Sequence, residues 1–358
     1  MSFDTPRSHA KVTIADIARK SGVSAATVSL ALRNKAGLRN ETRQRVLDTA
    51  QQLGYLYQSS NQAATRLEVN HIGVIIKARA NDPAATNSFY GPVLTGIEEI
   101  CRRRQIHLVY ANLLVDEKNV PIEPPRLLTE RHTDGLLIVG LQVNTALQTI
   151  LQQDNSPVVL VDAYAADNPF DAVVSDNFTG GYMATRHLLA QGHTKIAIVG
   201  SQPHAFPSIV ERRNGYCKAL AEAGLTPYFW DCPLWPEAAA EAARTYLVQQ
   251  PEVTAIFACN DALAIAVMQV LRERNCVPPD DLSIIGFDNI ELAQHTTPPL
   301  TTMRVDKTGM GRLAAQLLIN RIEYPAAALV QTTIRPELIC RQSVAVHNAV
   351  TNRAPILR

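Results

Sequence analysis

The sequence lacks most of the motifs that identify metal-binding, nucleotide-binding or catalytic sites. Its six cysteines are scattered, with no Cys-x-x-Cys pair and no histidine at metal-ligand spacing, so neither a disulfide framework nor a zinc site is expected. Gly-x-Gly-x-x-Gly, Gly-x-x-x-x-Gly-Lys and Gly-x-Ser-x-Gly motifs are also missing, which removes the common nucleotide-binding and hydrolase signatures. We therefore predict no metal, no cofactor and no catalytic residue.

Long hydrophobic runs are missing as well. The most apolar stretch, residues 262–271, is too short to cross a bilayer, and the first residues are polar. We therefore expect a cytoplasmic protein with no membrane partner. Its 358 residues, 46% of them hydrophobic, suffice for two or three folding units with buried cores.

An overall excess of either charge is nearly absent, since 34 Lys and Arg face 33 Asp and Glu. The charges are nevertheless unevenly distributed along the chain. Residues 1–66 carry ten basic and four acidic side chains, whereas the other residues carry 24 basic and 29 acidic ones. A small basic head on a mildly acidic body is typical of a protein that contacts nucleic acid with one end only.

The basic head is predicted to form three short helices. Thr13 and Ser24 are suitable N-caps for the first two, and Gly22 ends the first. The third helix is expected from about residue 42 to residue 53. The turn of three to four residues between the first two helices is the spacing of a helix-turn-helix, whose second helix enters the major groove of DNA.

The rest of the chain shows a different pattern of predicted elements. Residues 58–70 are polar and lack an apolar period, which indicates a linker or a marginal helix. Beyond them, short β-rich runs alternate with helix-length segments, and the runs cover residues 71–76, 106–113, 135–140, 158–162, 172–175, 195–200, 254–258 and 282–287. Continuous apolar strands of this kind favour parallel sheets covered by helices on both faces. We predict an α/β protein in which a small all-α helix-turn-helix domain precedes a two-lobed, doubly wound parallel-sheet core.

Several sequence motifs resemble those of one family. The string VTIADIARKSGVSAATVSLAL (12–32) resembles the DNA-binding domain of the LacI/GalR family of bacterial transcription regulators. The strings VSDNFTGGYMATRHLLAQGHTKIAIVG (174–200), ERRNGY (211–216) and SIIGFDN (283–289) resemble that family's periplasmic-binding-protein-like core in order and spacing. Together with the other motifs of the body, the resemblance covers roughly residues 11–345.

The resemblance implies a domain order and a function. It implies a helix-turn-helix domain over 11–57, a hinge over 58–70 and an effector-binding and dimerisation core over 71–345. Within the core, it implies an N-lobe of about 71–173 and 303–334 and a C-lobe of about 174–302 and 335–345. The implied protein is a homodimeric regulator without enzymatic activity, expected to be a repressor of a pseudo-palindromic DNA operator. A small molecule between the lobes controls its operator affinity.

The identity of that small molecule stays open between two classes. A sugar is the expected effector, because sugars are the common ligands of the family, and a purine-like corepressor is the alternative. A sugar-binding receptor that shares the core but has no role on DNA is a further alternative, which the basic head disfavours.

The expected DNA contacts lie on and beside the second helix. Hydroxyl groups can donate to phosphates or base edges, alanine methyl groups suit thymine methyl groups, and arginines suit phosphates. The predicted contacts are Thr13, Ser24, Ala25, Ala26, Thr27, Ser29, Leu30, Arg33, Arg39, Thr42, Arg43 and Tyr55.

The expected hinge departs from the family pattern. Where family members carry a leucine that wedges into the minor groove, this sequence has Ala64, with Leu67 one helical turn further on. A methyl group is a poor wedge between base steps, so weaker DNA bending is expected.

Motif matching also supplies the expected effector contacts. Carboxylates accept hydrogen bonds from vicinal hydroxyls, while arginine and asparagine donate, so the set Asp162, Arg212, Asn260 and Asp288 suits a polyhydroxylated or heteroatom-rich ligand. The candidates for stacking on its ring are Phe89, Tyr90, Trp235 and Phe287. Two further acids, Asp176 and Asp261, are expected to cap helices instead.

Overall fold

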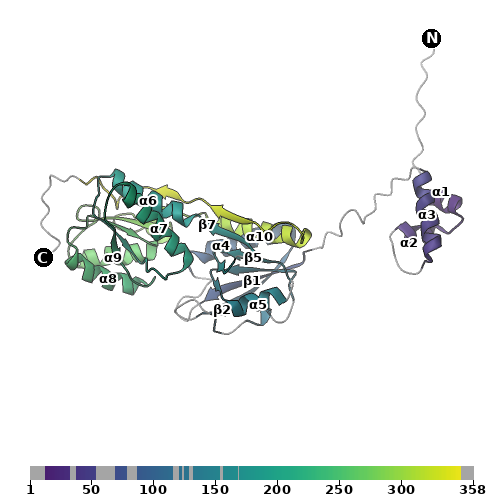
Figure 1. The fold of residues 1–358 in the computed structure, drawn as a ribbon, viewed down its shortest axis with the longest axis horizontal. Coiled ribbons are helices and arrows are strands. Elements are labelled where there is room, and N and C mark those ends of the chain that lie inside the picture. The colour runs from purple at the N-terminus through teal and green to yellow at the C-terminus, as the bar shows by residue number, and fades with distance from the viewer. Residues whose placement is uncertain are drawn as a thin grey trace, which may run out of the picture. The chain divides into compact units, whose positions relative to one another are not determined.

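The structure is a computed structural model that describes residues 13–32, 38–53, 69–78, 87–115, 121–122, 125–128, 132–153, 156–167 and 169–347. It divides into two compact units, Met1–Glu68 and Val69–Arg358 (Figure 1). Among the described residues, no helix is both long and apolar enough to cross a membrane.

The first unit contains the helices α1 (Ile14–Ser21), α2 (Ala25–Leu32) and α3 (Asn40–Gln52). The backbone N–H and the hydroxyl of Thr13 donate to the Asp16 carboxylate over 2.9 and 2.7 Å at the start of α1. Gly22 ends this helix with a φ of 71°, a left-handed conformation that glycine adopts without steric cost.

A small apolar core joins the three helices. Ile17 of α1, Val28 of α2 and Val46 of α3 are fully buried at its centre. Ile14 is 38% exposed. It is the first residue of α1, one turn before Ile17, and therefore lies at the edge of this small core.

The second unit is built on two sheets of six strands. The N-lobe sheet is parallel throughout, in the order β13 (Gln331–Ile334), β7 (Asp171–Ser175), β5 (Val158–Val161), β3 (Gly135–Val139), β1 (His71–Ala78) and β2 (His107–Leu114). The C-lobe sheet has the order β14 (Glu337–Ile339), β12 (Thr301–Arg304), β11 (Ser283–Asp288), β10 (Ala255–Ala258), β8 (Ile196–Val199) and β9 (Tyr228–Trp230), with only β14 antiparallel to its neighbour.

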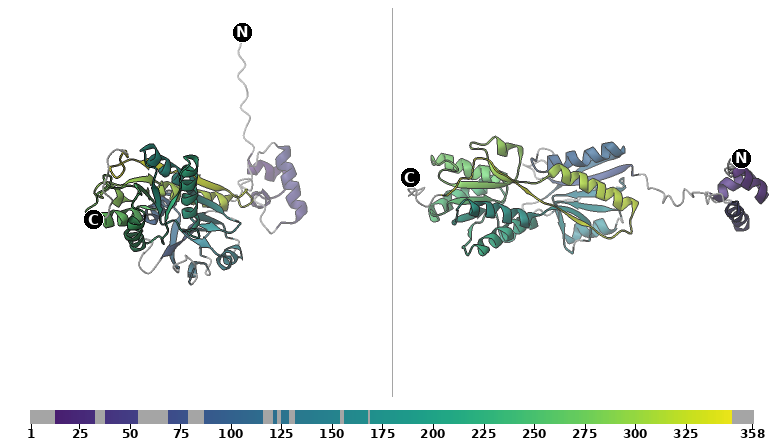
Figure 2. Two further views of the ribbon diagram at one scale, coloured as in Figure 1. Left: turned by 60° about the vertical axis from the view of Figure 1, so that its left-hand side comes forward. Right: turned by 90° about the horizontal axis from the view of Figure 1, so that it is seen from above.

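Helices cover both faces of each sheet. The N-lobe has α4 (Tyr90–Arg104) and α10 (Lys307–Glu323) side by side on one face, and α5 (Thr145–Gln153) on the other (Figure 2). In the C-lobe, α6 (Asn177–Ala190) packs against α7 (Pro207–Glu222), and α8 (Pro236–Gln249) packs against α9 (Asp261–Glu273) on the opposite face. The α/β architecture with parallel sheets predicted from the sequence is thus confirmed.

All eight expected strands are present. In most of them, burial on both faces makes the strand a run of apolar residues, whereas the edge strand β2 is largely exposed. The strands that the sequence did not indicate are short, and several are only half-buried. They include β9, β12, β13, β14 and a small pair, β4 (Gln142–Val143) with β6 (Tyr164–Ala165).

The chain passes between the lobes three times, after β7, after β12 and after β13. The first of these strands ends at Ser175, as the run over 172–175 predicts, and the second ends at Arg304. Ser175 pairs with Ile334 and Arg304 with Glu337. Each of these two crossings therefore begins at the end of a paired strand.

Close contact between α6 and α7 positions the helix that carries Arg212. A Cβ atom on Gly181 of α6 would lie 2.2 Å from the Arg212 carbonyl oxygen, and one on Gly215 of α7 would lie 2.1 Å from the Phe178 carbonyl oxygen. The two backbones are therefore in direct contact, which fixes the position of α7 relative to the start of α6.

Candidate functional site

A cleft of about 610 Å³ lies between the two lobes, where strand ends of both sheets meet. Seven of the eight predicted effector residues line it, namely Phe89, Tyr90, Asp162, Arg212, Trp235, Asn260 and Asp288. The first three come from the N-lobe and the other four from the C-lobe. A ligand in this cleft can therefore contact both lobes at once.

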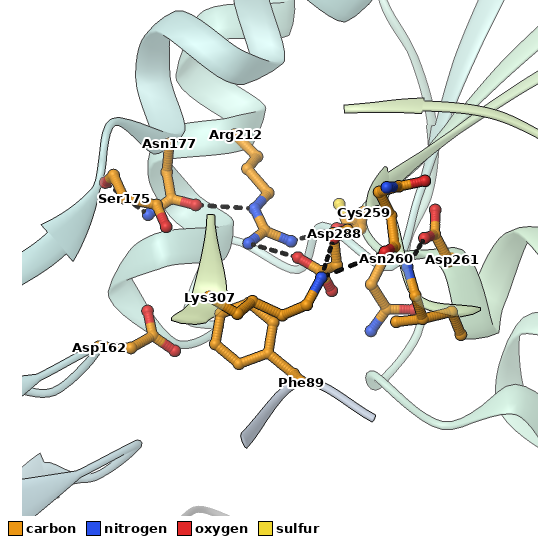
Figure 3. Close-up of polar contacts among 12 residues, drawn as sticks. Phe89, Asp162, Ser175, Asn177, Arg212, Cys259, Asn260, Asp261, Asp288 and Lys307 are labelled. Atoms are coloured by element: carbon orange, nitrogen blue, oxygen red, sulfur yellow. Dashed lines mark hydrogen bonds and ion pairs between the residues drawn. The ribbon is translucent and has the colours of Figure 1, made fainter. Parts of the chain in front are cut away.

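Arg212 of α7 is the most highly connected side chain of the cleft and is only 5% exposed. Its Nε donates to Asn177 Oδ1 over 2.9 Å, and its Nη1 donates to the backbone oxygen of Cys259. Its Nη2 lies 3.4 Å from Asp288 Oδ1 (Figure 3). These contacts hold the guanidinium group in one orientation before any ligand arrives.

The predicted residue Phe287 does not line the cleft. Its side chain is fully buried, and the Arg212 guanidinium carbon lies 3.7 Å from the centre of its ring. Both faces of β11 are buried, so the sequence pattern could not show which face this ring occupies. The Phe287 ring thus packs against the Arg212 guanidinium group without lining the cleft.

The two acids of the cleft occupy strained backbone positions. Asp162 directly follows β5 with a φ of 46°, and Asp288 ends β11 with a φ of 101°. Left-handed conformations are unfavourable for residues other than glycine and are often found at functional sites. Here they occur at two facing carboxylates, one in each lobe.

Burial dominates the electrostatics of both acids. It raises the pKa of Asp162 to about 6, although the charges of Lys77 and Arg212 oppose the shift. It also raises the pKa of Asp288, against the opposing effect of Arg212 and Lys307. The Tyr90 hydroxyl donates to Asp162 Oδ2 over 3.2 Å. The cleft thus contains hydrogen-bond acceptors that are poorly hydrated and prepared for a ligand that donates.

Lys307 contacts the backbone beside the cleft, a role that the sequence did not indicate. It begins α10 of the N-lobe, is 8% exposed, and donates from Nζ to the backbone oxygens of Asp288 and Asn289 in the C-lobe. Its contribution depends on the crossing after β12, which brings α10 close to the end of β11. Lys77 and Phe206, unlike Lys307, line the cleft themselves, and the sequence did not indicate them. For Lys77, the signal was a cation at the end of an apolar strand.

Of the two acids expected to cap helices, one does so and the other does not. Asp176 caps α6 by accepting from the Thr179 N–H over 3.0 Å. Asp261 does not cap α9, because the neighbouring Asn260 accepts from the Leu263 N–H instead. Asp261 is fully buried and accepts from the Ile290 N–H over 2.8 Å and the Thr302 hydroxyl over 2.5 Å.

In the first unit, the predicted DNA contacts gather on and beside α2. Ser24, Ala25, Ala26 and Leu30 are exposed, as are Thr13 and Arg39, whereas Thr27, Ser29, Thr42 and Arg43 are half-buried. Ser24 Oγ accepts from the Thr27 N–H over 3.1 Å and shares a hydrogen bond of 2.8 Å with the Thr27 hydroxyl. Arg33, Tyr55, Ala64 and Leu67 lie outside the described residues.

No group of three or more His, Cys, Asp or Glu side chains in the described part of the chain is arranged to hold a metal ion. The structure combines a helix-turn-helix unit with a two-lobed α/β core, which is the architecture of a class of DNA-binding transcription regulators. Residues 13–58 match the family of bacterial regulatory proteins called lacI, and residues 185–344 match the periplasmic binding protein-like domain.

Comparison with known proteins identifies the family. The chain is 32% identical over 341 residues to the HTH-type transcriptional repressor PurR of Photobacterium profundum, covering 93% of this chain and 98% of that protein. It is 29% identical over 339 residues to the PurR of Mannheimia succiniciproducens, with the same coverage. The chain belongs to the LacI family of bacterial transcription regulators.

Solved structures agree with this assignment. A complex of the transcriptional regulator CelR with cellobiose has a TM-score of 0.68 and 26% identity, covering 93% of this chain and 99% of that one. A LacI-family regulator from Enterococcus faecium with bound ribose has a TM-score of 0.67 and 27% identity, covering 78% of this chain and 100% of that one.

The raised pKa of Asp162 predicts a pH dependence of stability. Its folded-state pKa of about 6 exceeds the ordinary value of 3.8, so the native state holds more protons between these values. The contribution of Asp162 to stability should therefore fall as the pH rises from about 4 to about 6 and level off above. The full effect is about 3 kcal/mol.

Denaturant unfolding of the ligand-free protein and of Asp162→Asn between pH 4 and 7 measures this contribution. The free energy of unfolding of Asp162→Asn, relative to that of the wild type, should increase as the pH rises. Asp167→Asn, which changes an exposed carboxylate five residues further along the chain, is the control. A difference between wild type and Asp162→Asn that stays constant with pH would contradict the prediction.

Proposed function

We propose that this repressor binds a pseudo-palindromic operator as a homodimer and that a carbohydrate in the cleft controls its operator affinity. The observation that carries the proposal is the arrangement of Asp162 and Asp288 around the fixed guanidinium group of Arg212. One acid belongs to each lobe, so a ligand that engages both would favour one relative position of the lobes.

The chemistry of the cleft suits a polyhydroxylated ligand. Vicinal hydroxyls can donate to Asp162 and Asp288, while the Arg212 guanidinium can donate to a ring or hydroxyl oxygen. Phe89 and Trp235 also line the cleft and offer flat surfaces for the apolar face of a sugar ring. The related CelR and the Enterococcus faecium regulator were solved with cellobiose and with ribose, which supports this class of ligand.

A purine is the second candidate, because the relatives named above are repressors called PurR. A purine base could stack on the same aromatic side chains, and its ring N–H groups could donate to the same acids. It lacks vicinal hydroxyls, so it would use Asp162 and Asp288 less fully than a sugar does.

A ligand screen on the full-length protein separates the two candidates. Thermal unfolding and calorimetry are measured with D-ribose, D-glucose, cellobiose, guanine and hypoxanthine. A sugar is expected to raise the melting temperature, because a ligand that binds the native state stabilises it. Stabilisation by guanine or hypoxanthine without any sugar response would favour the purine candidate and overturn the sugar proposal.

Arg212→Lys keeps the charge but loses the planar fork of donors. It is expected to weaken binding of the stabilising ligand about tenfold or more. The matched control is Arg213→Lys, since Arg213 pairs with Asp231 and does not line the cleft. Its effect should stay within about twofold in the dissociation constant. Equal effects of the two variants would place the ligand elsewhere.

On DNA, we propose the contacts that surround α2. The exposed Arg39 is assigned to a phosphate, Ala25, Ala26 and Ser29 are assigned to base edges, and the hinge is assigned to Ala64 and Leu67. A phosphate contact contributes to all sequences alike and makes affinity dependent on salt, because binding releases counterions.

Arg39→Gln should therefore weaken binding to a selected operator and to unrelated duplex DNA by similar factors. It should also reduce the slope of log affinity against log salt by about one. Arg272→Gln on α9 of the core is the control and should change neither quantity. An unchanged salt slope in Arg39→Gln would remove this residue from the DNA interface.

We further propose that the protein is cytoplasmic and is not an enzyme. A bacterial repressor acts where the chromosome is, so we place the protein in the cytoplasm. The relatives are named as transcriptional repressors rather than enzymes, and the cleft residues are assigned to binding alone. A receptor without a DNA role is disfavoured by the helix-turn-helix match over residues 13–58.

A further inference from the structure

One contact across the cleft is made by aromatic rings and a lysine. Phe206 precedes α7 in the C-lobe, and its ring meets the edge of the Tyr164 ring, with centroids 5.2 Å apart and planes at 85°. The Nζ atom of Lys77 lies 5.1 Å from the centre of the same Phe206 ring. Tyr164 belongs to β6 and Lys77 to β1, which are both in the N-lobe. We call these three residues the Phe206 latch.

The geometry of the latch is favourable for attraction. An edge-to-face pair of aromatic rings directs the positive ring edge of one toward the negative face of the other. An ammonium group near a ring face is attracted by the same negative potential. Phe206 and Tyr164 are half-buried, and Lys77 and Phe206 line the cleft. The contact therefore lies at the cleft wall and not within the core of either lobe.

In each lobe, the latch lies next to a proposed effector contact. Tyr164 follows Asp162 by two residues, and Phe206 is the N-cap of the helix that carries Arg212. A hydrogen-bonded path also connects them. Asn177 donates from Nδ2 to the Tyr164 hydroxyl over 3.4 Å, and its Oδ1 accepts from Arg212 Nε over 2.9 Å. Movement of either lobe relative to the other must break the latch and disturb this path.

We infer that the Phe206 latch holds the two lobes in the relative arrangement of this structure and acts together with the effector. A ligand that joins Asp162 to Arg212 stabilises the same arrangement in which the Phe206 and Tyr164 rings meet. The ligand part of this inference rests on the proposed function, whereas the latch itself does not. Without the latch, the ligand-free protein populates a more open cleft.

The test measures the distance between the lobes in the ligand-free, full-length protein. Spin labels are attached through p-acetylphenylalanine at Thr149 of α5 and Thr245 of α8, two exposed positions in different lobes. This chemistry avoids the native cysteines. Distance distributions from pulsed electron paramagnetic resonance are then compared between the wild type and the variants.

Phe206→Leu keeps an apolar side chain but removes the ring, and Tyr164→Ala removes the partner ring from the other lobe. Each should broaden the distribution or add a second population at a different distance. The double variant should add little to either single variant, because both remove the same contact. The matched control is Phe178→Leu, an aromatic residue of the C-lobe that is 39% exposed and does not line the cleft.

Distributions of Phe206→Leu and Tyr164→Ala that match those of the wild type and of Phe178→Leu would overturn the inference. Circular dichroism melting of each variant shows that it is folded, and the two single variants test the contact independently. Since no ligand is added, a negative ligand screen would contradict the proposed function and leave this result intact. Conversely, a bound sugar with unchanged distance distributions would contradict the latch alone.

Discussion

The cleft depends on the fixed position of one guanidinium group. Arg212 is held by Asn177 at the start of α6, by the backbone of Cys259 after β10, by Asp288 at the end of β11 and by the ring of Phe287. The contact with Asn177 is favoured by the close approach of α6 and α7 at Gly181 and Gly215. A charge that is 5% exposed must be paired and hydrogen-bonded to be tolerated. The same pairing leaves it in a fixed geometry for recognition of a ligand.

Much of the fold could be predicted because two-sided burial leaves a clear pattern. Strands such as β3 and β5 are buried along their whole length, so they occur as continuous apolar runs. The half-buried strands β13 and β14 do not. The helix-turn-helix could be predicted because Thr13, Gly22 and Ser24 mark helix ends by local chemistry, which does not require any distant contact.

The residues of the site could be predicted where a sequence motif marks them. They could not be predicted where their role depends on contacts with residues that are distant in the sequence. Phe287 was assigned to the ligand because a strand buried on both faces gives no sign of which way a ring points. Asp261 was assigned to a cap because either residue of an Asn-Asp pair can serve. The contacts of Lys307 and Phe206 depend on the three crossings, which bring together segments that are distant in the sequence.

We propose that the cleft around Arg212 is energetically coupled to the DNA-binding unit. The most direct test of this coupling measures operator affinity with and without saturating cleft ligand, and ligand affinity with and without operator, on the full-length protein. Thermodynamic linkage requires the same factor in both directions, typically on the order of 5 to 150. We predict equal factors well above one in the wild type and a factor close to one in Arg212→Lys. An operator affinity that does not respond to a saturating ligand, or a full response retained by Arg212→Lys, would contradict the account.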